Sequence, residues 1–341
     1  MTDELLLERK LPPLLPRAEV LKILQEEIYG YMPPKPEKTE YAVRRNIIKN
    51  FCAGQAPCDE ITITCTLGGR EFSFPINAVI PAGKKNLPFF IHLNFRPENP
   101  DRYMPTEEII DNGFALISLC YKDITSDDED FENGLCGLLF DGGRREGNSP
   151  GKLAVWAWAA QRALDWAQSL GDTFDISRSC VCGHSRLGKT ALLASATDER
   201  FAFAYSNDSG CSGAALARGT TGETPADIIH KFPFWFCENY FKYADNEENM
   251  PFDQHYLIAS IAPRRVLIGS ASKDSWADPA QEYLACVAAA PAFENGFVHP
   301  DRLPVVNDVF FDGDIGYQMR EGLHYFGRED WQRLMSFVKS K

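Results

Sequence analysis

The chain has 341 residues, 44% of them hydrophobic and 24% charged, with a formal net charge of −13. This composition suits one globular domain over residues 1–341 and excludes a largely disordered chain. The acidic balance, without clusters of Lys and Arg, argues against nucleic acid or an anionic membrane surface as a partner. No apolar run approaches the ~20 residues of a transmembrane helix, and residues 1–10 do not have the pattern of a signal peptide.

The ten cysteines show no paired CxxC spacing and lack the density of a small disulfide scaffold. Cys120, Cys180 and Cys182 lie inside apolar runs. We therefore expect reduced, buried thiols in a cytoplasmic protein, or in a secreted protein if an export signal was removed ahead of residue 1. The sequence does not indicate an oligomeric state.

Residues 17–31 predict an amphipathic helix that ends at Gly30, and a Pro-rich segment follows it. Together they form an N-terminal helix and arm within residues 1–40. Two antiparallel strands are predicted next, ITITCTLGG and EFSFPINAVI, joined at Gly68 and Gly69.

The pattern then changes to buried strands that alternate with helices. Continuous apolar runs at 87–95 and 114–121 are typical of strands in a parallel sheet. A helix is predicted from about 151 to 170, closed by Gly171, and a final helix at 328–340. Further strands are predicted at 177–182, 201–206, 264–272 and 304–311.

This alternation predicts a three-layer α/β sandwich, with a doubly wound, mostly parallel sheet and antiparallel strands at its N-terminal end. Residues 217–256, rich in Gly, Thr, Phe and Asn, are interpreted as an insertion between strands that covers a site.

Residues 183–190 read GHSRLGKT between a predicted strand and a predicted helix, and they literally satisfy the phosphate-loop pattern. A phosphate loop normally follows the first strand of its domain, whereas this segment comes after several strands. The other interpretation is a nucleophile elbow, a sharp turn that presents Ser185 above the carboxyl edge of the sheet. Its usual G-x-S-x-G pattern is incomplete, because Leu187 stands at the second Gly position. We favour the elbow.

The order of three residues along the chain supports this choice. Ser185 is followed by Asp274, just past the strand at 264–272, and by His324, just past the strand predicted at 304–311. This is the order of the α/β-hydrolase triad, with each residue at the end of a strand. Taken alone, Asp274 could cap a turn and His324 could be a surface loop histidine.

Five other histidines show no metal-ligand spacing, so we predict no metal and no organic cofactor. They are His92, His184, His230, His255 and His299.

The string GHSRLGKTALLASATDERFAFAYSNDSGCSGAALARG at 183–219 closely resembles the glucuronoyl esterases, carbohydrate esterase family fifteen. The resemblance continues through GET, FPFWF, DQH, IAPRRVLIGSASKDSWADP and EGLH, and it includes LNFR at 93–96 and AVWAW. It extends from roughly residue 10 to the end of the chain. The Ser-Arg-x-Gly-Lys run makes it specific, because that run is unusual among hydrolases.

The resemblance implies an α/β-hydrolase fold and a role for each matching residue. Ser185 is then the nucleophile and His324 the base, and Arg186 helps to hold the oxyanion. The acid stays open between two positions, because many members place a Glu where this chain has Asp208 and others use an Asp at the position of Asp274. Fungal members join two cysteines at the positions of His184 and Tyr325, so that bridge is absent here.

The same resemblance implies that three residues contact a sugar: Lys189, Glu223 and Trp276. Each also has a simpler interpretation. Trp276 could be a core aromatic, Glu223 a helix cap, and Lys189 a solvated lysine in the first turn of a helix. A positive charge at a helix start is unfavourable, which favours a function for Lys189.

We therefore expect a serine carboxylic-ester hydrolase that acts on small or oligosaccharide esters through an acyl-enzyme. The substrate that the resemblance implies is a 4-O-methyl-glucuronoyl ester of a xylan–lignin linkage. One alternative is a carbohydrate acetylesterase, which would use the same triad. The other is a catalytically inactive, sugar-binding relative.

Overall fold

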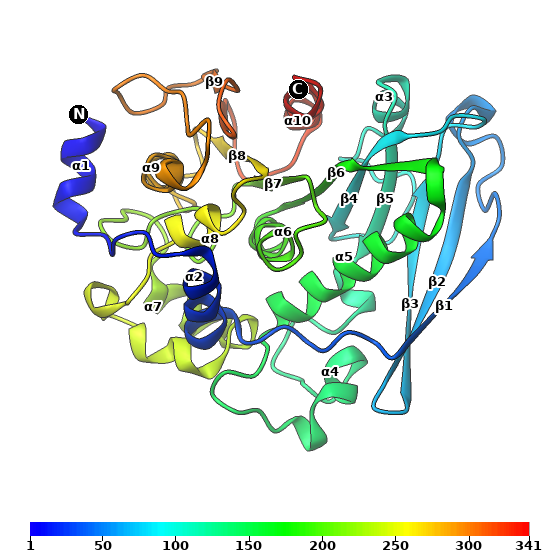
Figure 1. The fold of residues 1–341 in the computed structure, drawn as a ribbon, viewed down its shortest axis with the longest axis horizontal. Coiled ribbons are helices and arrows are strands. Elements are labelled where there is room, and N and C mark those ends of the chain that lie inside the picture. Colours follow the sequence, from blue (N-terminus) through cyan, green and yellow to red (C-terminus); the bar gives the residue numbers. More distant parts are fainter. Residues whose placement is uncertain (341) are drawn as a thin grey trace.

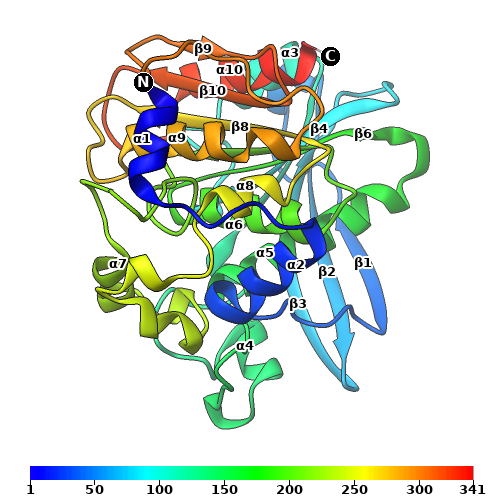
Figure 2. The ribbon, with the colours of Figure 1, turned by 60° about the vertical axis from the view of Figure 1, so that its left-hand side comes forward.

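The computed structural model describes residues 1–340, and its centre is one ten-stranded sheet (Figures 1 and 2). The strand order is β1-β2-β3-β5-β4-β6-β7-β8-β10-β9. The strands are β1 (Lys38–Arg44), β2 (Cys58–Leu67), β3 (Arg70–Val79), β4 (Leu87–Asn94), β5 (Ala115–Cys120), β6 (Phe174–His184), β7 (Phe203–Asn207), β8 (Arg265–Ala271), β9 (Val309–Phe310) and β10 (Ile315–Arg320).

Helices cover both faces of the sheet. They are α1 (Thr2–Arg9), α2 (Arg17–Leu24), α3 (Thr106–Asp111), α4 (Gly134–Leu139), α5 (Lys152–Ser169), α6 (Arg186–Thr197), α7 (Pro225–Lys231), α8 (His255–Ala259), α9 (Pro279–Ala289) and α10 (Arg328–Lys339). Figure 1 shows α5, α6 and α8 along one face and α3 and α10 along the other. The predicted three-layer α/β sandwich is confirmed.

Burial explains why the sheet changes from antiparallel to parallel pairing. Strands β5 and β8 are buried at every residue, as expected where helices cover both faces. Strand β8 pairs in parallel with β7 and β10, whereas β5 pairs in parallel with β4 and antiparallel with β3. Strand β2 alternates buried and half-buried residues and pairs antiparallel with β1 and β3. The predicted antiparallel strands at the N-terminal end are therefore confirmed.

Each face of the sheet has its own hydrophobic core. The larger core packs α5 and α6 against the sheet, and α5 is buried along nearly its whole length. The smaller core packs Trp331 and Leu334 of α10 and Ile109 of α3 against Phe90 and Leu267.

The prediction of a strand at 304–311 is wrong. Only Val309 and Phe310 form a strand there, and the strand that pairs in parallel with β8 is β10, residues Ile315–Arg320. Every residue of β10 is buried, yet Gln318 and Arg320 interrupt its apolar pattern. Their polar groups bind side chains from other segments, which a local pattern does not reveal.

Residues 217–256 form α7 and short 3₁₀ turns between β7 and β8. All ten cysteines are free and buried. Among residues 1–340, no helix combines the length and apolar character that a membrane crossing needs.

Candidate active site

Ser185 stands at the turn between β6 and α6 in a conformation that few non-glycine residues adopt. Its φ is 56° and its ψ is −127°. The turn is held because the Ser185 N–H donates to the carbonyl of Asn207, at the end of β7, over 2.8 Å. Strain of this kind persists only where the surroundings impose it, and it commonly marks functional residues. The geometry is that of a nucleophile elbow.

Two glycines allow the elbow to form, and their spacing differs from the usual pattern. A Cβ on Gly183 would lie 2.2 Å from the carbonyl oxygen of Leu187. A Cβ on Gly188 would lie 2.9 Å from Oγ of Ser206 and 3.1 Å from Cβ of Ser209. Gly188 thus lets α6 approach the end of β7 closely. The side chain of Leu187 is accommodated in the core, so this position does not require glycine. The second glycine is needed one position later than in G-x-S-x-G.

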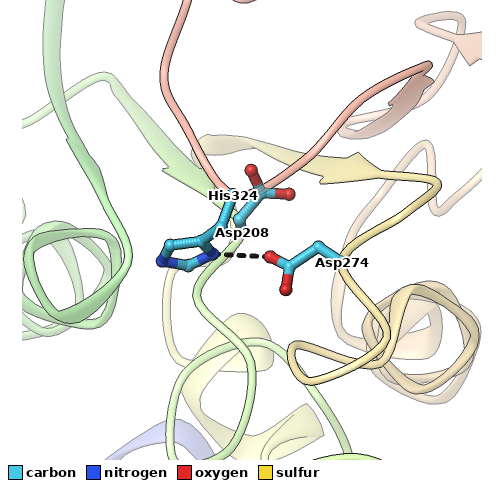
Figure 3. Close-up of side chains that lie close together, drawn as sticks. All are labelled: Asp208, Asp274 and His324. Atoms are coloured by element: carbon cyan, nitrogen blue, oxygen red, sulfur yellow. Dashed lines mark hydrogen bonds and ion pairs between the residues drawn. The ribbon is translucent and has the colours of Figure 1, made fainter.

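His324 and Asp274 form a close pair above the carboxyl edge of the sheet (Figure 3). Nδ1 of His324 lies 2.5 Å from Oδ2 of Asp274, and the carboxylate is buried while the imidazole is half exposed. The other oxygen of Asp274 accepts the N–H of Ala277 at 3.4 Å. His324 follows β10, not the strand predicted at 304–311. A carboxylate on Nδ1 keeps the proton there and leaves Nε2 free to act as a base.

Asp208 also approaches His324, but its contacts are different. Its Oδ2 accepts a hydrogen bond from Nη2 of Arg320 at 3.1 Å, and its buried Oδ1 has no hydrogen-bond partner among residues 1–340. Burial raises the pKa of Asp208 well above its ordinary value. Within residues 1–340, the ligand atoms of Asp208, Asp274 and His324 lie within 4.8 Å of one another, close enough to hold a cation. Nδ1 of His324 is already bonded to Asp274.

His184, next to Ser185, lies against the imidazole of His324. Its Nδ1 lies 2.8 Å from Oδ1 of Asn207, and its ring centre is 4.3 Å from that of His324. Burial, helped by the charge of His324, lowers the pKa of His184 to about 3. It therefore stays neutral when His324 takes up a proton.

Arg186 is the first residue of α6, so its N–H has no partner within the helix. Its guanidinium forms an ion pair with Asp127 and stacks over the ring of Trp235, 4.6 Å from the ring centre. Asp127 also accepts the indole N–H of Trp235 at 2.8 Å and the hydroxyl of Tyr121 at 2.9 Å. In the part of the chain that the structure describes, Nε of Arg186 is buried without a hydrogen-bond partner. Sequence reasoning missed Asp127, which has no motif around it.

One cavity brings together most of the residues singled out from the sequence. Its lining includes Ser185, Arg186, Lys189, Asp208, Glu223, Trp276 and His324. Asp274 reaches it through His324. Phe232 and Trp235, from the segment at 217–256, complete the wall.

Glu223 and Trp276 support each other at the mouth of this cavity. The indole N–H of Trp276 donates to Glu223 at 3.0 Å, and the N–H of Glu223 donates to the carbonyl of Trp276 at 2.9 Å. Trp276 is 48% exposed, so it is not a core residue. Thr224 and Asp227 form the cap of α7, so Glu223 is not the cap either.

Lys189 is buried, and its ammonium donates to the carbonyls of Ser209 and Cys211. Burial lowers its pKa. Because an ammonium has three protons, one remains for a ligand in the cavity. A phosphate loop needs its lysine free to bind a phosphate, whereas this ammonium is bound by two carbonyls, which argues against the nucleotide interpretation.

Comparisons with known proteins identify relatives of this chain. Residues 63–295 match a family model described as "Glucuronyl esterase, fungi". Carbohydrate esterase MZ0003, from an unknown prokaryotic organism, is 39% identical over 237 residues, which cover 68% of this chain and 54% of that protein. A 4-O-methyl-glucuronoyl methylesterase of Thermothelomyces thermophilus is 27% identical over 84% of this chain and 68% of its own. The solved glucuronoyl esterase from Solibacter usitatus superposes with a TM-score of 0.85 at 31% identity, covering 95% of this chain and 91% of that one.

Proposed function

This chain belongs to the glucuronyl esterase family, carbohydrate esterase family fifteen, and from that membership we propose that it is a serine esterase that hydrolyses glucuronate esters. One observation carries the proposal. Ser185 and His324 line the same cavity as three side chains suited to a sugar, Lys189, Glu223 and Trp276. Two of the relatives are named 4-O-methyl-glucuronoyl methylesterase, which supports esters of 4-O-methyl-glucuronic acid as the proposed substrates of this chain.

In the first half of the reaction, His324 accepts the hydroxyl proton of Ser185 while the oxygen attacks the ester carbonyl. Asp274 keeps the other imidazole proton in place and stabilises the imidazolium that forms. His324 then gives its proton to the departing alcohol, and a glucuronoyl-enzyme remains. Water repeats the sequence, with His324 as base, and releases the acid and Ser185.

The negative oxygen of each tetrahedral intermediate needs donors that are already in position. The backbone N–H of Arg186, which has no partner within α6, is one, and the helix dipole supports it. The Arg186 side chain lines the same cavity, and its positive charge favours a negative oxygen there. Asp127 and Trp235 hold that guanidinium, so it does not need to reorganise during the reaction.

The sugar is recognised by the remaining wall of the cavity. A uronic acid carries no charge when it is esterified, so it offers hydroxyls to Lys189 and Glu223 and an apolar ring face to Trp276. The hydrogen bond from Trp276 to Glu223 fixes the ring and the carboxylate relative to each other. 4-Nitrophenyl acetate has no sugar and cannot make these contacts.

The test compares benzyl glucuronate with 4-nitrophenyl acetate, using the wild type and Ser185→Ala. We expect kcat/KM of the wild type to favour the glucuronate ester, and Ser185→Ala to lose both activities. A preference for the acetate would support the acetylesterase alternative instead. Failure of a fluorophosphonate probe to label Ser185 would support the inactive, sugar-binding alternative.

A further inference from the structure

The loop that carries His324 is wrapped around one buried guanidinium. Arg320, the last residue of β10, donates from Nη2 to the carbonyl of Leu323 at 2.9 Å and to the carbonyl of Tyr325. These two residues flank His324 on either side. The Tyr325 ring lies over the guanidinium, with its centre 3.8 Å from the central carbon.

The loop follows the guanidinium so closely that it leaves no space for a side chain at its first bend. Gly322 has a φ of 136°, and a Cβ there would lie 2.6 Å from Nη1 of Arg320. Arg320 itself is only 1% exposed. The backbone conformation of the loop therefore depends on its contacts with the guanidinium.

Two buried carboxylates hold the guanidinium from the other side. Nε of Arg320 donates to Oδ2 of Asp330 at 2.8 Å, and Nη2 also lies 3.1 Å from Oδ2 of Asp208. Asp330 accepts the N–H of Gly327, at the start of α10, at 2.9 Å, so it ties the far end of the loop to the same guanidinium. Both carboxylates are inaccessible to solvent.

We propose that Arg320 is a positioning residue for ester hydrolysis: it fixes residues 321–327 so that His324 stays on Asp274, and Asp208 acts on the reaction through Arg320. The proposal rests on the function proposed above. Among its contacts within residues 1–340, Asp208 binds Arg320, whereas the imidazole is bonded to Asp274.

The planar fork of an arginine is essential to this arrangement, because one side chain must reach two carboxylates and several carbonyls at once. A lysine keeps the charge but concentrates its three donors on one atom. Arg320→Lys therefore tests position with little change in charge. The matched control is Arg265→Lys. Arg265 is the first residue of β8, so it lies at the amino end of the parallel strands, whereas Arg320 lies at the carboxyl end. It also binds backbone carbonyls, those of Phe311, Gly313 and Phe337.

The experiment measures kcat and KM for benzyl glucuronate, thermal unfolding, and the proton NMR signal of the His324 Nδ1–H, which lies far downfield when it is bonded to a carboxylate. For Arg320→Lys we expect kcat to fall at least about 100-fold, because displacing a catalytic group by about 1 Å costs that much. KM should change by less than about 3-fold, since the sugar contacts are untouched. The downfield signal should be lost. Arg265→Lys should lose thermal stability but keep kcat and the signal.

Equal effects of the two substitutions on kcat, or a retained downfield signal in Arg320→Lys, would overturn the proposal. If Arg320→Lys does not fold, Asp208→Asn alone and combined with Asp274→Asn gives the same answer. When Asp208 acts through Arg320 to hold His324 against Asp274, its substitution adds little once Asp274 is lost. A double variant far less active than the product of the single effects predicts would show that Asp208 replaces Asp274 directly, and would also overturn the proposal.

The NMR signal is measured on the free protein, so it tests the position of His324 without any substrate. A wild type that shows the signal but hydrolyses no glucuronate ester would contradict the proposed function and leave the role of Arg320 standing. If the wild type hydrolyses the glucuronate ester and Arg320→Lys is equally active, the proposed function stands and the role of Arg320 is contradicted.

Discussion

Asp274→Asn should abolish nearly all activity. The reason is the orientation that the contacts of Asp274 would impose on the new amide group. One oxygen of Asp274 accepts the N–H of Ala277, and the other faces Nδ1 of His324. In the variant, the amide oxygen keeps the contact with Ala277, because an amide NH₂ cannot accept a hydrogen bond. The NH₂ group then donates to Nδ1 of His324. This fixes the imidazole proton on Nε2, the nitrogen that must accept the proton of Ser185.

A base held in the wrong tautomer costs about 10⁴-fold in kcat in a serine hydrolase, which corresponds to about 5 kcal/mol of transition-state stabilisation. The assay is the steady-state release of benzyl alcohol from benzyl glucuronate. Asp274→Ala should lose less than Asp274→Asn, because water can then replace the carboxylate and either tautomer is available. Asp59→Asn is the control, since Asp59 is a buried carboxylate bound to Arg45 and Asn46 at a distant edge of the sheet.

Activity of Asp274→Asn within about ten-fold of the wild type would refute the assignment of Asp274 as the acid, since a misplaced tautomer cannot be so mild. Equal losses in the Asn and Ala variants would refute the argument from the tautomer and leave orientation alone as the role of the carboxylate.

Ser185→Ala should lose hydrolysis of every ester without a change in melting temperature, because the side chain of Ser185 makes no hydrogen bond within residues 1–340 that the fold depends on; retained activity would contradict its role as nucleophile. Trp276→Ala should lower kcat/KM for benzyl glucuronate by roughly 1–3 kcal/mol but change 4-nitrophenyl acetate hydrolysis far less, and equal losses would mean that Trp276 supports the fold. Burial raises the pKa of Glu282 from 4.5 to about 7, so the folded state holds this proton more tightly than the unfolded state and stability is lost as pH rises through 7. Urea unfolding at pH 5 and pH 8 should therefore show that Glu282→Gln gains roughly 2 kcal/mol relative to the wild type at the higher pH, and a pH-independent difference would contradict this. Calorimetry should detect no binding of ATP, because the ammonium of Lys189 is held by two carbonyls.

The layered fold could be predicted from the sequence because its strands are continuous apolar runs and its helices have a clear apolar face. Most of the cavity could also be anticipated, since Ser185, Lys189, Glu223 and Trp276 lie in recognisable strings that the fold brings together. The missed strand β10 shows the limit. Gln318 binds Tyr205, 113 residues away, and Asp330 in the last helix, so its burial depends on partners outside its own strand.

The same limit applies to the residues that hold the catalytic groups in place. Asp127 and Arg320 act through contacts 59 and 112 residues away in sequence, with Arg186 and Asp208. A charged residue in an acidic loop or at the end of a strand is usually solvated, so neither position stands out. The sequence leaves the choice between Asp208 and Asp274 open, because both follow strands at the same edge of the sheet. The hydrogen bond from His324 to Asp274 supports Asp274, and the choice stays a proposal.

Asp127 has a consequence for any attempt to alter this protein by exchanging loops. Its carboxylate joins Arg186 of the elbow to Trp235 of the segment at 217–256. A chimera that receives that segment from a relative receives aromatic residues that pack against the relative's own residue at position 127. Arg186 then loses its stacking partner unless position 127 is transferred as well. The unit of exchange is therefore discontinuous: the loop around residue 127 and the segment at 217–256 form one module, although 89 residues separate them.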